Sequence, residues 1–282
     1  MRKSGQKILK RIASHDLSEE MNCINALQKT PFTINKEVLQ VLDTVWKNNI
    51  YVDGLSRENI DPPPYPFDVA PDEMSSAQRQ EFKKWRGKKA AIFQANSKSL
   101  SKRLQIERTL RVAKDFQKYD EFFYVWQLDF RSRKYPVSDF MNPQSADYGK
   151  ALIKFAHGAR IERDEDADWL AIHGANCYGE DKISLKDRIE WAYSIESDVV
   201  KTVEKPLEYT WWMTASSPFQ FLAWCVEWYD FLKEGLGFVT HLPVSADGSC
   251  NGLQHLLAIL RDEQGGKAVN LLPSSIPADI YQ

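Results

Sequence analysis

Apolar residues recur at helical spacing along most of the chain, and this pattern predicts a largely helical protein. The clearest example lies between residues 35 and 49, where apolar positions three and four apart follow Thr33 or Asn35 as a helix cap. Further helical segments are predicted at residues 1–30, 77–118 and 159–235. Five prolines interrupt the pattern between residues 58 and 76, so this stretch is predicted to be an extended connector.

One stretch has the composition of a buried strand instead. Residues 122–128 are aromatic and β-branched and run directly into Asp129. If the strand continues, alternation places Arg131 and Arg133 on one face, where two guanidinium groups would form a fork for a phosphate group. A pair of surface arginines in salt bridges with Asp129 or Asp139 fits the same residues. Strand and helix patterns together predict an α+β fold that is predominantly α-helical.

Shorter signals predict where individual helices begin and end. Residues 142–144 have turn chemistry, and a short helix is predicted from about Tyr148 to Ala156, with Lys150 near its start pointing towards the same groove as the arginines. The pattern also predicts a helix end at residues 172–176, one amphipathic helix over residues 185–204, and a helix start at Ser217-Pro218. The tryptophans at 211, 212, 224 and 228 are interpreted as core residues, and His157 and His173 as structural.

Charge is distributed unevenly in a chain whose composition is otherwise that of an ordinary soluble protein. Its 282 residues allow one large domain or two small ones, and the net charge is only −2. Basic residues nevertheless cluster between Arg79 and Lys118, with Lys102 and Arg103 in the middle and only three acidic residues among them. Such a run is typical of a solvated helix face. The size of the imbalance equally supports contact with a nucleic-acid phosphate backbone.

Cysteine use and apolar runs argue against several classes of protein. The four cysteines form no CxxC pair and have no metal-ligand spacing, so we interpret them as reduced, mostly buried thiols of a cytosolic protein. The longest apolar run, residues 219–232, contains charged side chains and falls short of the roughly 18 residues needed to span a membrane. The basic N-terminus faintly resembles a mitochondrial transit peptide, but a basic helix is the simpler interpretation, and no secretory pattern is seen.

The rest of the chain is organised around residues 243–255. There an apolar run ends at Asp247, a turn of Gly and Ser follows, and a helical pattern then begins. A carboxylate at the exit of a buried strand is held rigidly and suits a hard cation such as Mg²⁺. An acidic residue before a helix is also typical of an N-cap, and spacing alone favours that interpretation. Residues 261–267 are then predicted to be a helix end with a Gly stop, and residues 274–281 the start of another helix.

Several motifs occur in an order that resembles the single-chain RNA polymerases of phages and mitochondria. They are Asp129 to Tyr135, Asn142 to Gln144, Ile172 to Asn176, Pro206 to Trp212, Ser217 to Phe219, Asp247 to His255, and Arg261-Asp262 through Pro273. The resemblance is strong from about residue 120 to 273 and looser back to about residue 24. Several unrelated motifs in one order are far more specific than any one of them. The resemblance implies a right-hand polymerase fold, with thumb helices and a partial palm containing a small antiparallel sheet.

The same resemblance divides the chain into parts. Residues 1–120 correspond to an N-terminal arm and a thumb-like helical region, with the Pro-rich connector at 58–76 inside it. The remaining parts are a first palm segment at 121–158, a helical palm insertion at 159–235, a second palm segment with polymerase motif A at 236–262, and the truncated start of the fingers at 263–282.

Individual site residues are implied in the same way. Asp247 resembles the first metal-binding aspartate of motif A, with the backbone carbonyl of Gly248 as a second ligand. The ordered motifs therefore favour metal ligation by Asp247, although one of its oxygens can still cap the turn. Contacts with nucleic acid are implied at Arg131, Arg133, Tyr135, Lys150, Lys102 and Arg103. The family usually has Gly between the two arginines, where this chain has another small residue, Ser132.

The resemblance points to an RNA product. In related DNA polymerases, the fifth residue after the motif A aspartate is a Glu that crowds the 2′ position of the sugar. Here that residue is Gly252, so a ribonucleotide 2′-OH meets no block from this position. The implied activity is that of a DNA-directed RNA polymerase, a nucleotidyltransferase that uses a DNA template, ribonucleoside triphosphates and Mg²⁺ to make RNA.

The family pattern also contains parts that this sequence lacks. Two-metal transfer needs two Mg²⁺ ions held by carboxylates from more than one segment. The family supplies its second aspartate and its fingers helix beyond the counterpart of residue 282. We therefore expect a subunit that is active only with a partner carrying the fingers and the other palm aspartate, and that shares two Mg²⁺ ions with it. The closest architecture is the heterodimeric middle-gene RNA polymerase of N-four-like phages, whose small subunit ends after motif A.

Such a subunit would act in the cytoplasm of an infected bacterial host, with a promoter-opening accessory factor and without a membrane. A mitochondrial location is the alternative. Two other functions fit the same sequence. One is a truncated, inactive polymerase remnant. The other is a non-enzymatic helical protein that binds nucleic acid through the basic face of residues 79–118.

Overall fold

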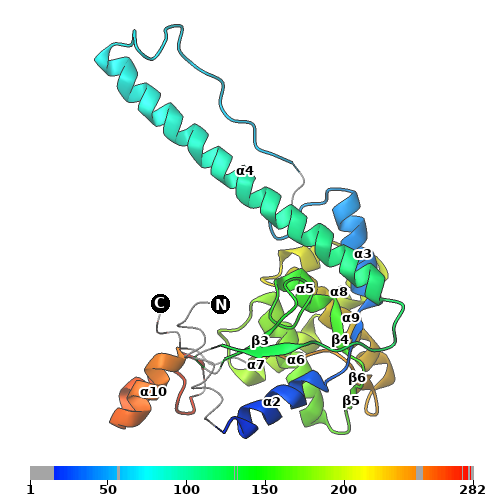
Figure 1. Cartoon of the computed structure of the whole chain (residues 1–282). Helices are drawn as coiled ribbons and strands as arrows, with labels where there is room; N and C mark the ends of the chain where they lie inside the picture. The colour runs from blue at the N-terminus through cyan, green and yellow to red at the C-terminus, as the bar shows by residue number, and fades with distance from the viewer. Residues whose placement is uncertain are drawn as a thin grey trace.

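The computed structural model describes residues 16–55, 58–129, 131, 133–245, 250–274, 276–278 and 280. It confirms a predominantly helical α+β protein with small antiparallel sheets. The helices are α2 (Ser18–Gln28), α3 (Lys36–Lys47), α4 (Ser76–Phe116), α5 (Asp147–Ala151), α6 (Asp164–Tyr178), α7 (Leu185–Ser194), α8 (Glu196–Glu204), the 3-10 helix η1 (Trp211–Thr214), α9 (Pro218–Glu234), α10 (Asn251–Leu260) and α11 (Glu263–Ala268). Figure 1 shows α4 projecting away from a body in which α5, α6, α7, α8 and α9 lie together.

The strands in the described residues form three separate antiparallel pairs. They are β1 (Phe32–Ile34), β2 (Trp126–Leu128), β3 (Lys134–Pro136), β4 (Ile153–Phe155), β5 (Ala159–Arg160) and β6 (Val239–Thr240), with β1 paired to β4, β2 to β3, and β5 to β6. Of the buried strand predicted over residues 122–128, only the last three residues form a strand, and none of these three is buried. Phe122 instead forms an isolated bridge with Phe32, and the side chain of Val125 is 63% exposed.

The helix predicted after residue 35 is confirmed. The side-chain oxygen of Asn35 accepts a hydrogen bond from the backbone N–H of Val38 at 3.2 Å, so Asn35 is the cap, whereas Thr33 lies in β1. Val38 and Leu42 are fully buried, and α3 packs against α9 through this face. Burial of an apolar stripe against another helix is what makes a helix of this length stable.

The core surrounds α9, which packs against α3, α5, α6 and α8. Trp212, Trp224 and Trp228 are fully buried, which confirms their interpretation as core residues. The indole N–H of Trp224 donates to the backbone carbonyl of Leu170 on α6 at 2.7 Å, so the polar atom of this buried ring is satisfied. Trp211 packs against the same core.

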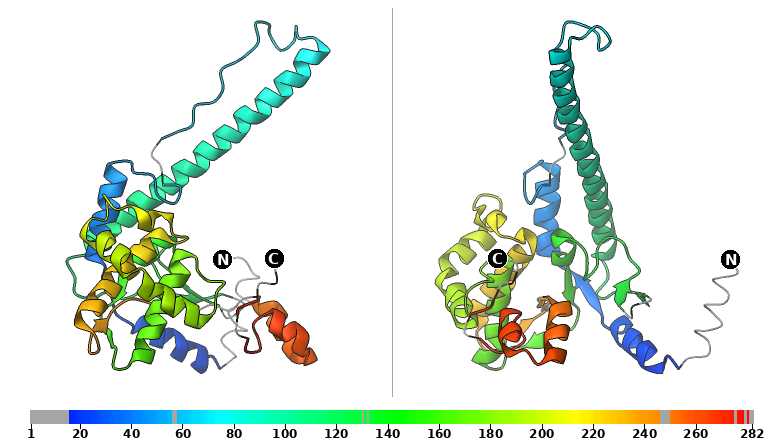
Figure 2. Two further views of the ribbon diagram at one scale, coloured as in Figure 1. Left: turned by 180° about the vertical axis from the view of Figure 1, so that it is seen from behind. Right: turned by 90° about the vertical axis from the view of Figure 1, so that its left-hand side faces the viewer.

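The long basic segment forms the single helix α4, and the Pro-rich connector runs beside it (Figure 2). Residues 58–75 of the connector contain no helix or strand, as predicted, and α4 begins at Ser76. Asn96 on α4 accepts from the backbone N–H of Ile60 at 2.9 Å and donates to its carbonyl at 2.8 Å. Farther along the helix, the indole N–H of Trp85 donates to the carbonyl of Pro64 at 2.8 Å. These bonds hold the connector along the projecting helix.

Three helix boundaries predicted from the sequence are wrong. The helix end expected around Gly174 lies inside α6, because this glycine accommodates the ring of Trp224 and does not stop the helix. The helix expected over residues 185–204 is broken at Ile195 into α7 and α8. The short helix expected to reach Ala156 ends at Ala151, since the following residues form β4 and pair with β1.

The C-terminal part contains the helix expected after residue 250, but its end differs from the prediction. Arg261 adopts a left-handed conformation with φ of +55°, and Asp262 then caps α11 by accepting from the backbone N–H of Gly265 at 3.0 Å. Gly265 and Gly266 therefore lie within α11 and do not act as a stop. No helix is found in the described part of residues 274–281. None of the helices that the structure describes is long and apolar enough to cross a membrane.

Candidate functional site

The residues expected to hold the metal, Asp247 and Gly248, lie outside the described residues. The structure places the chain on either side of them. Residues 239–245 precede Asp247 in the chain, and α10 begins after Gly248, at Asn251. Cys250, at the start of α10, has a left-handed backbone with φ of +53°. The described part of the site is therefore the set of contacts that hold these flanks.

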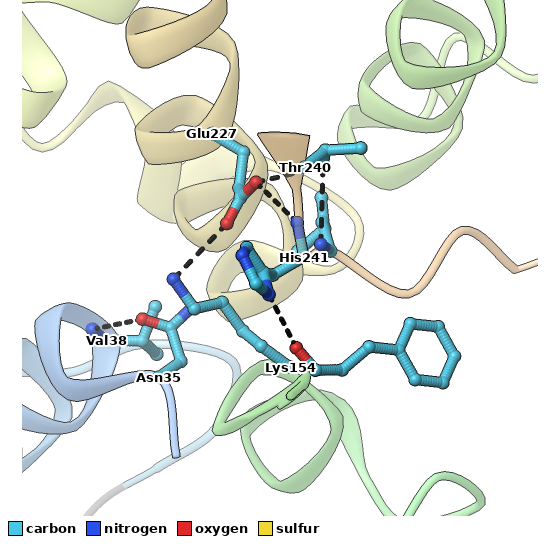
Figure 3. A network of polar contacts seen from close by, with 8 residues as sticks. Asn35, Val38, Lys154, Glu227, Thr240 and His241 are labelled. Atoms are coloured by element: carbon cyan, nitrogen blue, oxygen red, sulfur yellow. Dashed lines mark hydrogen bonds and ion pairs between the residues drawn. The ribbon is translucent and has the colours of Figure 1, made fainter. Parts of the chain in front are cut away.

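A buried network holds the segment of residues 239–245 (Figure 3). Its centre is Glu227 on α9, which is only 4% exposed. One carboxylate oxygen of Glu227 accepts from the hydroxyl of Thr240 at 2.9 Å and from the backbone N–H of His241 at 3.1 Å. The other oxygen lies 3.3 Å from Nζ of Lys154 on β4. One carboxylate thus joins α9, β4 and the segment before Asp247.

The backbone of the same segment also pairs with β4. The carbonyl of His241 accepts from the backbone N–H of Phe155 at 2.9 Å, and Nδ1 of His241 lies 2.8 Å from the carbonyl of Phe155. The backbone N–H of Leu242 donates to the hydroxyl of Thr240 at 3.3 Å. The chain is therefore held from two directions just before it reaches Pro243.

A cavity of about 210 Å³ opens beside this segment. Lys150 of α5, His173 of α6 and Gln220 of α9 line it together with Val244 and Ser245. Lys150 thus lies at the same cavity as the chain that leads to Asp247. The described lining of this cavity includes no residue of the β2–β3 hairpin, so a groove shared by Lys150 and the arginines stays a prediction.

Asp147 fixes the position of α5, and hence of Lys150, against α9. Its carboxylate accepts from the backbone N–H groups of Phe219 at 2.7 Å and Gln220 at 3.0 Å, and from the side-chain amide of Gln220 at 3.1 Å. Burial raises the pKa of Asp147 above its ordinary value, and these hydrogen bonds act in the opposite direction. The predicted cap Ser217 makes no side-chain hydrogen bond to the helix, although Pro218 occupies the first turn as predicted.

Replacing Asp147 with Ala is expected to lower the free energy of unfolding by about 2 kcal/mol, because backbone N–H groups at a buried helix start lose their acceptor. Asp147→Asn should cost less, since it keeps one acceptor oxygen and removes a charge from a buried position. Guanidinium unfolding of the two variants and the parent chain measures both effects. Equal stability of the Ala and Asn variants would contradict the capping role.

His173 and Cys177 form a buried pair on α6, with Sγ 3.6 Å from Nε2. Burial lowers the pKa of His173 to about 4 and raises the pKa of Cys177 to about 12, so both are uncharged at neutral pH. The structural interpretation of His173 agrees with this environment. Cys177 and Cys225 are buried free thiols, whereas Cys23 is exposed, so the expectation of mostly buried cysteines holds only in part.

The two arginines of the expected phosphate fork lie at the β2–β3 hairpin. The strand does not continue through Arg131, because the chain reverses between Leu128 and Lys134, so the predicted alternation does not apply. Asp129 organises the turn. Its Oδ1 accepts from the backbone N–H groups of Arg131 at 2.8 Å and Arg133 at 3.0 Å, and its Oδ2 lies 2.7 Å from the guanidinium of Arg131. The salt bridge that the sequence offered as an alternative is therefore present for Arg131, whereas Arg133 contacts Asp129 through its backbone N–H.

The environment of this turn keeps Asp129 ionised. Partial desolvation acts to raise its pKa, but the hydrogen bonds from Arg133 and Arg131 outweigh it, so the pKa of Asp129 lies below its ordinary value. Tyr135 lies on β3, opposite Gln127, and its hydroxyl is 3.4 Å from the guanidinium of Arg131. Arg131 and Tyr135 are thus brought together, while Ser132 lies outside the described residues.

Lys102 and Arg103 make contacts within the protein. Nζ of Lys102 donates to the carbonyl of Asp53 at 2.7 Å, and the guanidinium of Arg103 donates to the side-chain oxygen of Asn59. Both side chains are half-buried and hold the chain that enters the connector. The exposed basic residues of the helix are Arg79, Lys83, Lys84, Arg86, Lys88, Lys98, Arg108, Arg111 and Lys114. The charged surface expected from the sequence is therefore formed chiefly by these side chains.

Gly252 lies exposed in the first turn of α10, and a Cβ atom there would meet no described atom within 4 Å. The packing of the residues that the structure describes therefore does not require glycine at the position. None of the residues of α10 is buried. Among the described residues, no group of three or more His, Cys, Asp or Glu side chains is placed to hold a metal ion.

Two residues that organise the site, Glu227 and Asp147, were not identified from the sequence. Glu227 carried a signal, because it is an acidic residue within the longest apolar run, and such a residue in a core needs a partner. Asp147 carried none, since a cap supplied from 72 residues away leaves no local pattern.

Comparison with known proteins shows that the chain is similar to RNA polymerases. Residues 162–282 match the family model described as DNA-dependent RNA polymerase. Over its whole length, the chain is 37% identical to the DNA-directed RNA polymerase of Enterobacteria phage K11 and 36% identical to T7 RNA polymerase of Escherichia phage T7. Over 99% of its length it is 34% identical to DNA-directed RNA polymerase 1, mitochondrial, of Arabidopsis thaliana.

The match covers only a part of each relative. The chain spans 30% of the K11 polymerase, 31% of the T7 polymerase and 28% of the Arabidopsis polymerase. The chain is therefore related to DNA-directed RNA polymerases of the phage and mitochondrial type over less than a third of their length.

Proposed function

We propose that this relative of the phage and mitochondrial RNA polymerases is the N-terminal catalytic subunit of a two-subunit, phage-type DNA-directed RNA polymerase. It supplies the motif A aspartate and contacts to the template and the RNA, while a second polypeptide supplies the fingers and the other palm aspartate. The proposal rests on the 36% identity with T7 RNA polymerase along the whole chain. The stretch from Asp247 to His255 also lies within the polymerase family match.

The proposal assigns a role to each part of the chain. Residues 1–120 form an arm and a thumb-like region, residues 121–158 and 236–262 form the palm, and residues 159–235 form the palm insertion. Residues 263–282 begin the fingers. The chain is similar to the phage polymerases along all of its length. This similarity supports the presence of several polymerase subdomains and argues against a single shared motif.

The donor atoms that the proposal needs fit Mg²⁺ in kind. Asp247 would offer a carboxylate oxygen and Gly248 a backbone carbonyl oxygen, and Mg²⁺ prefers such hard oxygen ligands. When bound, Mg²⁺ would stabilise negative charge on the reacting phosphate and favour attack of the RNA 3′-OH on the α-phosphate of the nucleotide. A second carboxylate would come from the partner subunit, so that two ions would be shared between the chains.

Basic side chains would hold the nucleic-acid phosphates. Arg131 is already oriented by its salt bridge to Asp129 and carries the planar guanidinium that suits a phosphate group. Arg133 and Tyr135 lie on the same hairpin, and Lys150 lies at the cavity beside the approach to the metal site. Lys102 and Arg103 would add positive charge at the middle of α4, together with the exposed cations of that helix.

Gly252 would leave room for the 2′-OH of a ribonucleotide. No described neighbour lies within 4 Å of a Cβ atom at this position, so packing within the described residues does not explain the glycine. A role in leaving space for the substrate would explain it. The substrates would be ribonucleoside triphosphates on a DNA template. Promoter opening would involve a separate accessory factor, and the reaction would take place in the cytoplasm of an infected bacterium.

Reconstitution tests the proposal. The 282-residue chain, co-expressed with a polypeptide that carries a fingers helix and a second palm aspartate, is expected to co-purify with it and to make RNA on a primed DNA template when Mg²⁺ is present. The isolated chain is expected to be inactive because the site needs carboxylates from both chains. Template-dependent RNA synthesis by the isolated chain, or a single reading frame that joins both parts, would refute the two-subunit proposal.

A further inference from the structure

Glu227 is a charged side chain buried in the core, and its contribution to stability does not explain why it is there. A buried ion pair such as Glu227 with Lys154 is weak evidence for stability, because removing two charges from water offsets much of their attraction. Apolar residues of similar volume at the two positions would serve the core at least as well. Glu227 is nevertheless buried and accepts bonds from three groups, Lys154, Thr240 and His241 (Figure 3).

Two of those three groups belong to the segment that leads to the metal site. The carboxylate of Glu227 accepts hydrogen bonds from the hydroxyl of Thr240 and from the backbone N–H of His241. Both hydrogen bonds are lost if an apolar side chain replaces Glu227. Backbone pairing with Phe155 fixes His241 from the side of β4, and Glu227 fixes it from the side of α9. Five residues separate His241 from Asp247 in the sequence.

We propose that Glu227 is a positioning residue, which fixes the segment of residues 239–245 so that Asp247 is presented at one place in the polymerase site. Lys154 assists by neutralising Glu227 and by tying it to β4. The effect on metal binding rests on the proposed function, whereas the effect on the segment does not. Groups that orient the ligands of a metal typically change its affinity 10- to 100-fold when they are removed.

The decisive variant is Glu227→Met with Lys154→Met. It retains volume and removes both charges together, so the thermal midpoint is expected to stay close to that of the parent chain. Glu227→Gln is a second, conservative variant, which keeps one acceptor oxygen for the segment. Glu234→Met is the matched control, because Glu234 lies exposed on the same helix.

The first measurement is amide hydrogen exchange in the isolated 282-residue chain. The double Met variant is expected to accelerate exchange of the His241 amide by about tenfold or more, because its charged acceptor is lost. Amides of α6 and α7 should keep their rates, as should all of these amides in Glu234→Met. Unchanged exchange at His241 would overturn the proposal, whatever the activity of the chain.

The second measurement is the Mg²⁺ dependence of RNA synthesis by the reconstituted polymerase. The double Met variant should raise the half-saturating Mg²⁺ concentration by about tenfold and leave the KM for nucleotide unchanged, with Glu227→Gln in between. Faster exchange with an unchanged Mg²⁺ requirement would overturn the proposal and leave Glu227 a structural residue. If the parent polymerase makes no RNA, the proposed function has failed, and the exchange measurement still decides whether Glu227 holds the segment.

Discussion

Replacing Asp247 with Ala is expected to abolish nucleotide incorporation by the reconstituted polymerase while the two subunits still assemble. A metal ion at the reacting phosphate contributes several kcal/mol of transition-state stabilisation, and each 1.36 kcal/mol is a factor of ten in rate. Loss of the ligand should therefore slow incorporation by about 1,000-fold or more. Primer extension in the presence of Mg²⁺ measures the rate, and gel filtration measures assembly.

Asp187→Ala is a suitable control, because Asp187 is an exposed carboxylate on α7. It should leave incorporation within about twofold of the parent, as surface substitutions usually have small effects. Full activity of Asp247→Ala would show that Asp247 only caps a helix. The non-enzymatic alternative makes a different prediction, namely nucleic-acid binding that weakens steeply with salt whether or not Asp247 is present.

The helices that the sequence predicted well are those whose signals are local. The cap at Asn35 and the apolar stripe that follows lie within one stretch of chain, and α3 forms there. α4 was predicted for the same reason, and its first turn carries a capping box at Ser75. The connector was equally clear, because five prolines leave few backbone conformations open.

The contacts that hold the candidate site depend on residues far apart in the chain, and no local pattern contains them. Glu227 meets Lys154 across 73 residues, and Asp147 meets Phe219 across 72. Apolar periodicity indicates which face of a helix is buried, but it does not say which distant carboxylate will be placed at its end. The ordered motifs indicated a resemblance to phage and mitochondrial RNA polymerases without showing these contacts, because a resemblance transfers residue types and not the distances between them.

The positions of Arg131 and Arg133 also could not be predicted from a local pattern. Alternation is a rule for extended strands, and it predicted one face for Arg131 and Arg133 only on the assumption that the strand continues. Asp129 accepts backbone N–H groups from both arginines and closes a turn in place of the strand. A short acidic residue that bonds to the backbone ahead of it is typical of turns, so Asp129 itself was the available signal.

Gly174→Ala is expected to be the most destabilising of the single glycine substitutions open to this chain's helices. A Cβ atom at this position would lie 2.0 Å from Cε2 of Trp224 and 2.4 Å from two further ring atoms. The ring cannot move away, because it is fully buried, stacked between Phe221 and Trp228, and hydrogen-bonded to Leu170. Overpacking of a core costs about 1–3 kcal/mol and more where neighbours are rigid. This outweighs the roughly 1 kcal/mol that Ala gains over Gly in a helix.

Gly87→Ala provides the matched control, since the same change is made inside α4 where a Cβ atom meets nothing within 4 Å. It should stabilise the chain by up to about 1 kcal/mol through helix propensity alone, so the two substitutions are expected to have opposite signs. Thermal unfolding should place the midpoint of Gly174→Ala about 5 °C or more below the parent. Trp224→Leu removes the ring that the new methyl group would strike, so the combined variant should lose less stability than the sum of the two single changes. Additive losses would show that Gly174 is required for a reason other than the close approach of Trp224.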